Sequence, residues 1–464
     1  MITVNPYGET SAGVLGLGRS GLAAARSLTA GGAHVLVWDD NPARRDEAQA
    51  AGFTLSDPAA DDWTRNAALI LSPGIPLTHP APHGEVAKAR AAGIPVVGDM
   101  ELFWAALARL PKATTVAVSG TNGKSTTTAL VAHTFGELGV PVVAAGNIGR
   151  SVLDIDPLPE GGAYVLEVSS YQIDLTPGLK PDIAILLNIT PDHLDRHGGL
   201  EGYVSVKRRL FANQEAGDWA IVNVDDPHCD AICGELTASG SPWVIPVSVE
   251  RPVAGGVYVD GSTLVDATEG TPRPVGDLTR LPALKGRHNW QNAAAAYAAV
   301  SRRVAEPERV FCVMATFPGL PHRMERVGEA GGVVFINDSK ATNQASAARA
   351  LSSFETIYWI AGGIAKEDHL DEVRPFLPRV ASAYVIGRDG PLFERLLQPM
   401  LPTVMCGNLA TAVARAADDA SAHQGGTVLL SPAAASQDQF RDYEDRGDQF
   451  RAMAQTWIEQ KGMS

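Results

Sequence analysis

The chain of 464 residues is poor in cysteine, in aromatic side chains and in positive charge. Its four cysteines form no framework of paired spacings, which excludes a disulfide-stabilised secreted domain and indicates a reducing compartment. The 38 Lys and Arg residues are outnumbered by 52 Asp and Glu, and the net charge of −14 argues against a binder of nucleic acid or of an anionic membrane surface. No basic start with an apolar core opens the chain, and no apolar run approaches the ~20 residues that span a bilayer. We therefore expect a cytoplasmic protein without membrane insertion.

The most informative stretch is a glycine-rich turn between a predicted strand and a predicted helix. It follows the β-branched run Thr114–Val118 and consists of Ser119, Gly120, Thr121, Asn122, Gly123, Lys124, Ser125 and Thr126. Glycines let backbone N–H groups face phosphates, and the helix start adds partial positive charge. Lys124 would reach the terminal phosphates of a nucleotide, and Ser125 would bind Mg²⁺. The turn departs from a full Walker A motif because Val118 holds the place of the first glycine.

A second glycine-rich turn lies near the amino terminus. Gly16, Gly18 and Gly21 follow a short apolar strand and open an alanine-rich helix, and Asp39 ends the next predicted strand. This is the fingerprint of a dinucleotide-binding domain, so a dehydrogenase that binds NAD(H) stays an open alternative. Any helix that docks against a diphosphate uses the same glycines, so the turn alone does not distinguish a dinucleotide from another ligand that carries a diphosphate. Ser72 follows a later strand, at the edge of the sheet where open α/β sheets bind ligands. It is either a ligand contact or a simple turn residue.

Polar side chains also follow the strands after the phosphate loop. Glu167 stands inside the predicted strand Tyr164–Ser170, where an unpaired charge is costly, and we predict that it faces Mg²⁺ near Ser125. The alternative for this carboxylate is an exposed position on an edge strand. His193 follows the run Ile183–Ile189 at a strand tip. Three basic residues lie on the next predicted helix, and the pattern alone does not choose among Lys207, Arg208 and Arg209.

The last third of the chain alternates strands with helices. Four predicted strands each end in small or polar residues, as in a nucleotide-binding parallel sheet: 333–336, 357–360, 383–386 and 427–430. Together with the two glycine-rich turns, this pattern predicts an α/β protein of three domains. We expect a Rossmann-like domain at 1–98, a central P-loop ATPase-like domain with a mostly parallel sheet at 99–319, and a second Rossmann-like domain at 320–464. The Pro/Gly-rich stretch Phe317–Arg323 is the predicted hinge before the last domain.

Six motifs, taken in order, resemble the Mur ligases, which are ATP-dependent amide-forming enzymes of peptidoglycan precursor synthesis. They cover essentially the whole chain and lie at Gly120–Ser125, Gly146–Gly149, Glu167–Ser170, Asp192–Arg196, His288–Asn292 and Leu320–Arg323. Two further runs, Asn337–Asn343 and Leu430–Phe440, resemble the branch of the family that adds D-glutamate. The resemblance implies a first domain that binds a UDP-linked substrate, a central domain that binds ATP, and a last domain that binds the amino acid and ATP.

The reaction that the resemblance implies joins UDP-N-acetylmuramoyl-L-alanine to D-glutamate. The terminal carboxylate takes the γ-phosphate of ATP, and the amine of D-glutamate attacks the resulting acyl phosphate. Two Mg²⁺ ions are expected, because the carboxylate and the phosphate are both anions. The resemblance assigns one ion to Ser125 and Glu167 and the other to His193 and Lys207, with Lys207 as a CO₂-derived carbamate. Carbamylation requires a neutral amine, so the pKa of this lysine, ordinarily ~10.4, would have to be lowered or the product trapped by the metal.

The resemblance also implies one set of catalytic residues and three sets of contact residues. The catalytic residues would be Lys124, Glu167, His193 and Lys207. ATP would contact residues 120–126 together with Asn292, Arg323, Asp338 and Lys340. The UDP-linked substrate would contact Gly18, Arg19, Ser20, Ser72, Asn147 and His193. D-Glutamate would contact Thr342, Lys366, Ser436 and Tyr443.

Some positions depart from the family pattern. Asp40 and Asn41 replace residues that help to hold uracil in relatives, so no uracil contacts are assigned from the sequence. Tyr443 stands where phenylalanine is common, and Lys366 lies in a variant of a loop richer in glycine and aspartate. We expect a monomer whose domains close on the substrate. Besides the dehydrogenase, a non-enzymatic scaffold switched by ATP stays open as an alternative.

Overall fold

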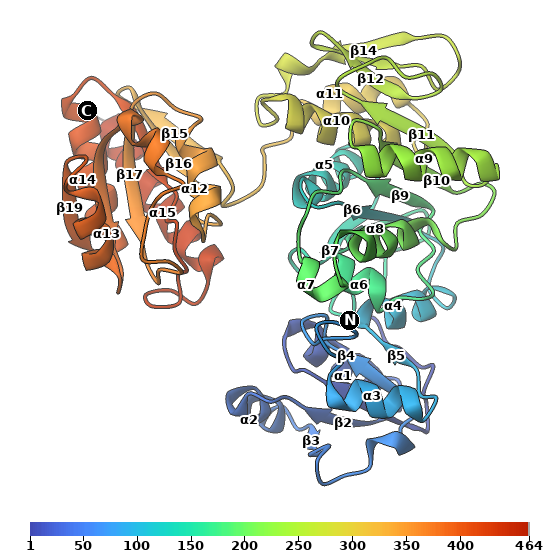
Figure 1. Cartoon of the computed structure of the whole chain (residues 1–464). Helices are drawn as coiled ribbons and strands as arrows, with labels where there is room; N and C mark the ends of the chain where they lie inside the picture. Colours follow the sequence, from blue (N-terminus) through green and yellow to red (C-terminus); the bar gives the residue numbers. More distant parts are fainter. Residues whose placement is uncertain (463–464) are drawn as a thin grey trace. The chain divides into compact units, whose positions relative to one another are not determined.

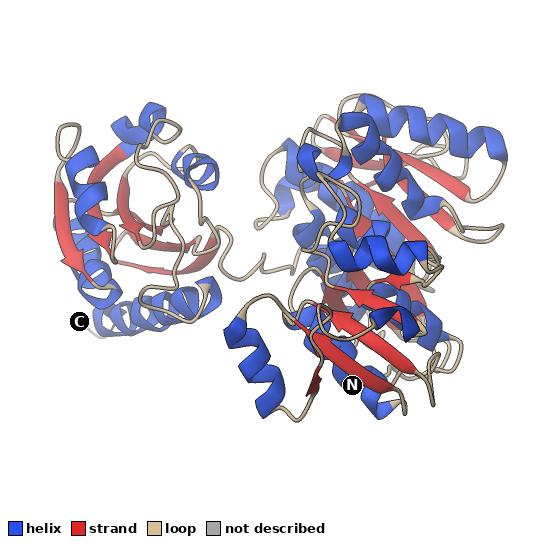
Figure 2. Ribbon diagram, turned by 60° about the horizontal axis from the view of Figure 1, so that its bottom comes forward, coloured by secondary structure: helices blue, strands red, loops and turns tan. Residues whose placement is uncertain are grey.

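The computed structural model describes residues 1–462 and forms two compact units, Met1–Phe317 and the chain from Pro318 onward (Figure 1). Each unit contains mostly parallel sheets with helices packed on both faces (Figure 2), which confirms the α/β prediction. Within residues 1–462, every helix is too short or too polar to cross a bilayer. The domain boundaries at residues 98 and 319 stay predictions.

The first sheet contains five strands, all parallel, in the order β3-β2-β1-β4-β5. Its strands are β1 (Ser11–Leu15), β2 (His34–Trp38), β3 (Thr54–Leu55), β4 (Ala68–Leu71) and β5 (Val96–Val97). Its helices are α1 (Arg19–Ala30), α2 (Pro42–Ala50), α3 (Gly84–Ala91) and α4 (Asp99–Leu107). Strand β1 lies between β2 and β4, so the turn after β1 opens at the point where the strand order reverses. Open α/β sheets bind ligands at such a point.

The second sheet contains nine strands in the order β14-β13-β12-β11-β10-β9-β6-β8-β7. Its strands are β6 (Thr114–Ser119), β7 (Val142–Gly146), β8 (Ala163–Glu167), β9 (Ile183–Leu186), β10 (Trp219–Asn223), β11 (Trp243–Ser248), β12 (Val257–Asp260), β13 (Thr263–Asp266) and β14 (Arg273–Asp277). All pairs are parallel except β12–β13 and β13–β14. Strand β6 pairs with β8 on one side and β9 on the other, so the loops that follow these three strands share one edge.

Helices cover both faces of this sheet. They are α5 (Lys124–Glu137), α6 (Ser170–Asp174), α7 (Leu194–His197), α8 (Leu200–Arg208), α9 (Pro227–Ser239), α10 (Arg287–Val300) and α11 (Val310–Met314). Helices α5, α10 and α11 bury one face, and the core on the other face continues into the core of the first sheet. Backbone hydrogen bonds also join the two layers, from Ile2 to Leu153 and from Gly98 to Leu175. The first unit is therefore one packed body.

The second unit is built on a six-stranded sheet in the order β15-β16-β20-β17-β18-β19. Its strands are β15 (Glu325–Ala330), β16 (Val333–Asn337), β17 (Ile357–Gly362), β18 (Val380–Ile386), β19 (Thr403–Gly407) and β20 (Gly426–Leu430). Its helices are α12 (Gln344–Leu351), α13 (Gly390–Leu397), α14 (Leu409–Ala422) and α15 (Tyr443–Gly462). Side chains of β17 alternate between two cores: Trp359 packs with α12 and α13, whereas Tyr358 and Ile360 pack with α14 and α15.

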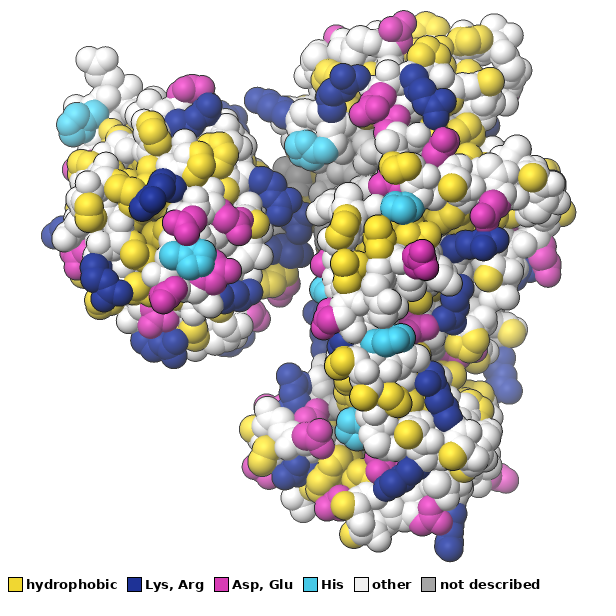
Figure 3. All heavy atoms as spheres, in the orientation of Figure 1, with side chains coloured by type: hydrophobic (Ala, Val, Ile, Leu, Met, Phe, Trp, Pro, Cys, Tyr) yellow, Lys and Arg dark blue, Asp and Glu magenta, His cyan; other side chains and the backbone are white. Residues whose placement is uncertain are grey.

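The four predicted strands of this unit are correct, and the two edge strands were missed. Strand β15 pairs antiparallel with β16 and carries charged residues and a glycine, so it lacks the continuous apolar run of a central parallel strand. Strand β19 contains no buried residue. On the face drawn in Figure 3, Lys and Arg side chains alternate with Asp and Glu over each unit. The net negative charge is therefore not gathered into one acidic surface on this face.

Candidate active site

The phosphate loop lies between β6 and α5, as the sequence predicts. Gly120 and Gly123 have φ of 152° and 85°, backbone conformations that side chains rarely adopt. A Cβ at Gly123 would also lie 2.4 Å from Oδ1 of Asn292, so α10 packs directly against the loop. This contact brings Asn292, a predicted ATP residue, to the loop, and the buried side chain leaves room only for glycine at residue 123.

Lys124 is folded back over the loop. Its Nζ donates hydrogen bonds to the carbonyl oxygens of Gly120 and Thr121, each at 2.9 Å. Ser125 follows in the first turn of α5 and is 8% exposed. The ammonium group thus stands where loop N–H groups and a helix N-terminus create an anion site. If a phosphate bound here, the ammonium group of Lys124 would donate to charged phosphate oxygens instead of to two neutral carbonyl oxygens.

Lys207 reaches the same loop from α8. Its side chain is 1% exposed, and Nζ donates to Ser119 Oγ at 3.0 Å and to the Gly120 carbonyl oxygen at 2.9 Å. Burial, with a smaller contribution from the charge of Lys124, lowers the pKa of Lys207 to about 7. A substantial fraction of this amine is therefore neutral near pH 7, which is the form that reacts with CO₂.

Glu167 is the last residue of β8, so the prediction of a strand through Ser170 was wrong. Ser169 instead caps the short helix α6. The Glu167 side chain is 2% exposed; Oε1 accepts a hydrogen bond from Asn147 Nδ2 at 2.8 Å, whereas Oε2 is buried without a partner. Residue 167 pairs in register with Val118, next to the phosphate loop. An unpaired buried carboxylate oxygen at this edge fits a Mg²⁺ ligand, because a cation would supply the missing partner.

His193 is the residue that precedes α7, and its φ is 50°. Its ring lies 5.0 Å from the ring of Tyr171, and Nε2 is 3.4 Å from the Asp192 carboxylate. Among the described residues, no hydrogen bond or ion pair joins His193 to Lys207 or Glu167. The structure thus brings Glu167 and Lys207 to the phosphate loop, whereas the contacts of His193 are with its own loop and α6.

No cluster of three or more His, Cys, Asp or Glu side chains in residues 1–462 is arranged to hold a metal ion. The predicted metal ligands include only one such side chain for each ion, Glu167 or His193. Mg²⁺ commonly takes one or two carboxylates and completes its shell with waters and substrate phosphates. The sparse donor set therefore fits ions that bind together with a nucleotide.

A cavity of about 340 Å³ opens at the first sheet, between the ends of β1, β2 and β4. Four predicted substrate residues line it: Gly18, Arg19, Ser20 and Ser72. The Ser72 hydroxyl donates to the Gly16 carbonyl oxygen at 2.9 Å, and this bond holds the two loops together. Asn147 and His193, assigned to the same substrate, do not line this cavity.

Arg44 is a lining residue that the sequence interpretation missed. It extends from α2 across Gly18 and donates to the Leu17 carbonyl oxygen at 3.2 Å. The sequence signal was present, because two arginines occupy the first turns of the helix after β2. The neighbouring Arg45 instead packs over Trp38 and donates to backbone carbonyls. Only the position of α2 shows which arginine reaches the cavity.

In the second unit, the loops after β16, β17 and β20 meet at one edge of the sheet. Asp338 is 6% exposed; Oδ1 accepts from the Met324 N–H at 3.2 Å and Oδ2 from the Ser431 hydroxyl at 2.8 Å. Burial raises the pKa of Asp338 to about 7. Residues Ile364 and Ala435 form a backbone bridge between the other two loops. Predicted ATP and D-glutamate residues thus share this edge.

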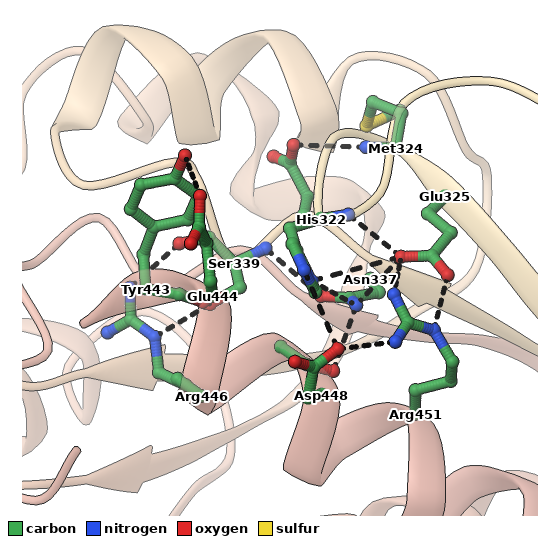
Figure 4. A network of polar contacts seen from close by, with 12 residues as sticks. His322, Met324, Glu325, Asn337, Ser339, Tyr443, Glu444, Arg446, Asp448 and Arg451 are labelled. Carbon is green, nitrogen blue, oxygen red and sulfur yellow. Dashed lines mark hydrogen bonds and ion pairs between the residues drawn. The ribbon is translucent and has the colours of Figure 1, made fainter. Parts of the chain in front are cut away.

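A polar network ties the predicted hinge to this edge (Figure 4). The backbone of His322 donates to Glu325 and accepts from the Lys340 N–H. Glu325 in turn pairs with Arg451 of α15 through two hydrogen bonds, at 2.6 and 3.0 Å, and this guanidinium lowers the pKa of the carboxyl against the effect of burial. Arg323 is held between the residues of this network, so its backbone is fixed relative to Asp338.

The predicted D-glutamate residues lie on the same three loops and the start of α15. Ser436 is 1% exposed, and its hydroxyl is buried without a hydrogen-bond partner. Lys366 lines a small cavity together with Gln344 of α12 and the neighbouring Glu367. The Tyr443 carbonyl oxygen accepts from Ser339 Oγ at 2.8 Å, and Lys340 Nζ lies 5.6 Å from the Tyr443 ring. Thr342 follows Lys340 in a tight turn.

Known proteins resemble this chain over nearly its whole length. Three family models match the chain: "Mur ligase MurD-like, N-terminal domain" at residues 10–98, "Mur ligase middle domain" at 118–300 and "Mur ligase, glutamate ligase domain" at 322–434. Ligases named UDP-N-acetylmuramoylalanine--D-glutamate ligase from Caulobacter sp. (strain K31) and Phenylobacterium zucineum are each 49% identical to it, over 97% and 98% of both chains.

The chain belongs to the Mur ligase family. The resemblance stated from the sequence motifs is therefore confirmed, and the enzyme is an ATP-dependent ligase that forms amide bonds. This Mur ligase also shares its fold with solved structures at low identity. A UDP-N-acetylmuramate-alanine ligase from Thermotoga maritima has a TM-score of 0.55 at 16% identity, covering 97% of this chain and 100% of its own. A UDP-N-acetylmuramoylalanyl-D-glutamyl-2,6-diaminopimelate--D-alanyl-D-alanyl ligase from Acinetobacter baumannii has a TM-score of 0.55 at 17% identity, covering 91% and 90%.

Proposed function

We propose that this Mur ligase joins D-glutamate to UDP-N-acetylmuramoyl-L-alanine, with ATP cleaved to ADP and phosphate, as a cytoplasmic step of peptidoglycan precursor synthesis. The observation that carries the choice of substrates is the 49% identity to ligases of that name over nearly the whole of both chains. The geometry supports the chemistry, because a phosphate loop, a buried carboxylate and a buried lysine meet at one sheet edge.

The first step activates a carboxylate. An oxygen of the terminal carboxylate attacks the γ-phosphorus of ATP, the bond to the bridging oxygen breaks, and ADP leaves. Lys124 and the loop N–H groups hold the phosphates, and Asn292 packs against the loop from α10. Bound Mg²⁺ would neutralise the two anions as they approach each other. Ser125 and Glu167 are the residues assigned to hold it.

The second step forms the amide. The neutral amine of D-glutamate attacks the acyl carbon and becomes positively charged. The bond between the acyl carbon and the phosphate oxygen then breaks, phosphate leaves, and the nitrogen loses one proton to give the amide. Ser436, with a buried hydroxyl that lacks a partner, and Lys366, a cation beside a small cavity, are suited to hold the two carboxylates of the amino acid. Thr342 and Tyr443 are assigned to the same subsite. Arg323, Asp338 and Lys340 are assigned to ATP.

Lys207 is the residue we assign to a carbamate. Its amine is buried, its pKa is lowered to about 7, and it already lies against the phosphate loop. The neutral amine attacks CO₂, a proton leaves, and the product is an anionic carbamate that could bind a second Mg²⁺ together with His193. The change from ammonium to carbamate would reverse the local charge beside Lys124.

The UDP part of the substrate is assigned to the cavity at the first sheet, with Gly18, Arg19, Ser20 and Ser72 as its contacts. Asn147, which the Glu167 carboxylate holds in place, and His193 are assigned to the part of the substrate nearer to the reaction. An NAD(H)-binding role for this cavity fits less well, because residues 10–98 match the MurD-like N-terminal domain of Mur ligases.

The proposal is tested by measuring phosphate release with ATP, Mg²⁺ and UDP-N-acetylmuramoyl-L-alanine against a panel of amino acids. We expect release to depend on D-glutamate, with little response to L-glutamate, D-alanine or a diamino acid. Release triggered equally by another amino acid would reject the substrate assignment. No release with any amino acid, together with nucleotide binding, would favour the scaffold.

A further inference from the structure

Arg446 is a fully buried cation without a carboxylate partner. Its side chain is 0% exposed, and within the described part of the chain no acidic oxygen lies at ion-pair distance from it. Arg451, one and a half turns further along α15, shows the contrast, because it pairs with the carboxylates of Glu325 and Asp448. Burying an unpaired guanidinium is costly, so a guanidinium at this place calls for a physical reason.

The guanidinium joins two of the three loops at the sheet edge, and Figure 4 shows it beside Ser339 of the first. Nε donates to Ser339 Oγ at 3.0 Å, and Nη2 donates to the Ser339 carbonyl oxygen at 2.8 Å. Nη1 and Nη2 both donate to the Ala434 carbonyl oxygen at 3.2 Å. The third loop is also close, since a Cβ on Gly363 would lie 3.4 Å from Nη1.

These are the loops that carry the residues assigned to D-glutamate. Ser339 precedes Thr342 by three positions, Ala434 precedes Ser436 by two, and Gly363 precedes Lys366 by three. All acceptors around Arg446 are uncharged, so its positive charge is not neutralised locally. Its pKa, lowered to about 10 by burial, still leaves it charged at neutral pH. Asp438 contributes an opposing charge from beyond ion-pair distance; its Oδ2 accepts a hydrogen bond from the Arg388 N–H at 2.7 Å, and its Oδ1 is buried without a hydrogen-bond partner.

We propose that Arg446 is a positioning residue that gives the amino-acid subsite its preference for a dicarboxylate. Its hydrogen bonds to Ser339 and Ala434 place a fixed positive charge beneath the loops of Thr342 and Ser436, and the bound amino acid neutralises that charge. A neutral amino acid would leave that charge uncompensated. The inference rests on the proposed function, because it takes these loops as the D-glutamate subsite.

Two variants separate the charge from the hydrogen bonds. Arg446→Lys keeps the charge and loses most of the hydrogen bonds, whereas Arg446→Gln keeps a donor and loses the charge. We expect KM for D-glutamate to stay within about threefold of the wild type in the lysine variant, and to rise ~tenfold or more in the glutamine variant. KM for UDP-N-acetylmuramoyl-L-alanine should stay within about twofold in both. Arg415→Gln, which removes an exposed charge from α14, is the matched control and should change neither value.

A second readout uses glutarate, a dicarboxylate without an amine, as a competitive inhibitor. Its inhibition constant should follow KM for D-glutamate across the variants. An equal rise in both variants would mean that Arg446 acts only through its hydrogen bonds, and this would overturn the proposal. If circular dichroism shows that Arg446→Gln does not fold, Arg446→Lys tests the proposal by itself. A ~tenfold rise in KM for D-glutamate in the lysine variant then overturns the proposal. Failure of the proposed function is a separate result, namely a wild-type enzyme without D-glutamate-dependent phosphate release.

Discussion

Lys207 donates a hydrogen bond from Nζ to the carbonyl oxygen of Gly120 at 2.9 Å, although 87 residues separate them in the chain. Helix α8 thus places a buried amine directly against the phosphate loop. Burial at this position, with a smaller contribution from the charge of Lys124, lowers the pKa of Lys207 to about 7, although its helix looks basic and solvated from the sequence. It also gives the clearest test of the second metal site.

Lys207→Ala should reduce kcat by ~100-fold or more, because the ligand for the second Mg²⁺ would be lost. Short-chain carboxylic acids such as acetate should restore part of the activity by supplying the missing carboxylate. Arg208→Ala is the matched control, since this neighbour is exposed and pairs with Glu235 on the surface. Full activity of Lys207→Ala without any added acid would exclude the carbamate.

Glu167→Gln should also reduce kcat by ~100-fold or more, while the protein without nucleotide stays as stable as the wild type or becomes more stable. The amide can still accept a hydrogen bond from Asn147, and the substitution removes a buried charge whose Oε2 has no partner. Thermal unfolding with and without Mg-ATP measures both effects. Glu160→Gln, an exposed position before the same strand, is the control. A large loss of stability without nucleotide would show that Glu167 has a structural role instead.

The phosphate loop could be predicted because its signal is local. Gly120, Gly123 and Lys124 lie within five residues, and the strand and helix that flank them are read from the same stretch. Lys207 could not be distinguished from Arg208 and Arg209 by pattern, because its role depends on burial against a loop far away in the chain. Lys207 lies in the last turn of α8, and its burial depends on tertiary packing. The hydrophobic periodicity of a nine-residue helix does not determine that packing.

The same reasoning explains the other misses. Strands β15 and β19 are sheet edges, where one side lacks a neighbour and the sequence need not be apolar. Arg44 reaches the first cavity only because α2 packs where it does. Asp338, by contrast, was identified from a family motif, yet its raised pKa follows from burial beside Ser431 and the backbone of Met324, which the motif does not report.

Arg44→Gln should raise KM for UDP-N-acetylmuramoyl-L-alanine by roughly 5- to 20-fold and leave KM for ATP unchanged, because a charge-assisted contact to a phosphate would be lost. Arg44 and Arg19 are the basic side chains that line the cavity at the first sheet. Steady-state kinetics with each substrate varied in turn gives both constants. Arg90→Gln, an exposed change on α3, serves as the control. An unchanged KM for the UDP-linked substrate would remove Arg44 from the site.

The stability of the protein should fall with rising pH because of Asp338. The pKa of this carboxyl is about 7 in the folded protein and 3.8 ordinarily. Between these values the folded protein holds a proton that the unfolded chain has lost, so the free energy of unfolding decreases as pH rises from about 4 to about 7. Asn cannot titrate. The stability of Asp338→Asn relative to the wild type should therefore increase between pH 5 and pH 8, by on the order of 1–3 kcal/mol.

Thermal unfolding of both proteins at pH 5 and pH 8 measures the difference in stability between Asp338→Asn and the wild type. The test is the change of this difference with pH, not its size at either pH. Ser353→Ala, an exposed change in the same unit, controls for general effects of the buffer. A constant gap between Asp338→Asn and the wild type would mean that the carboxyl is ionised throughout this range.

The central claim is that the terminal carboxylate of the UDP-linked substrate takes the γ-phosphate of ATP before the amide forms. The most direct test labels both oxygens of that carboxylate with ¹⁸O and follows the label by mass spectrometry of the products. The account predicts that each released phosphate carries one ¹⁸O atom and that the new amide carbonyl keeps the other. Unlabelled phosphate, formed in equal amount with the D-glutamate product, would contradict it.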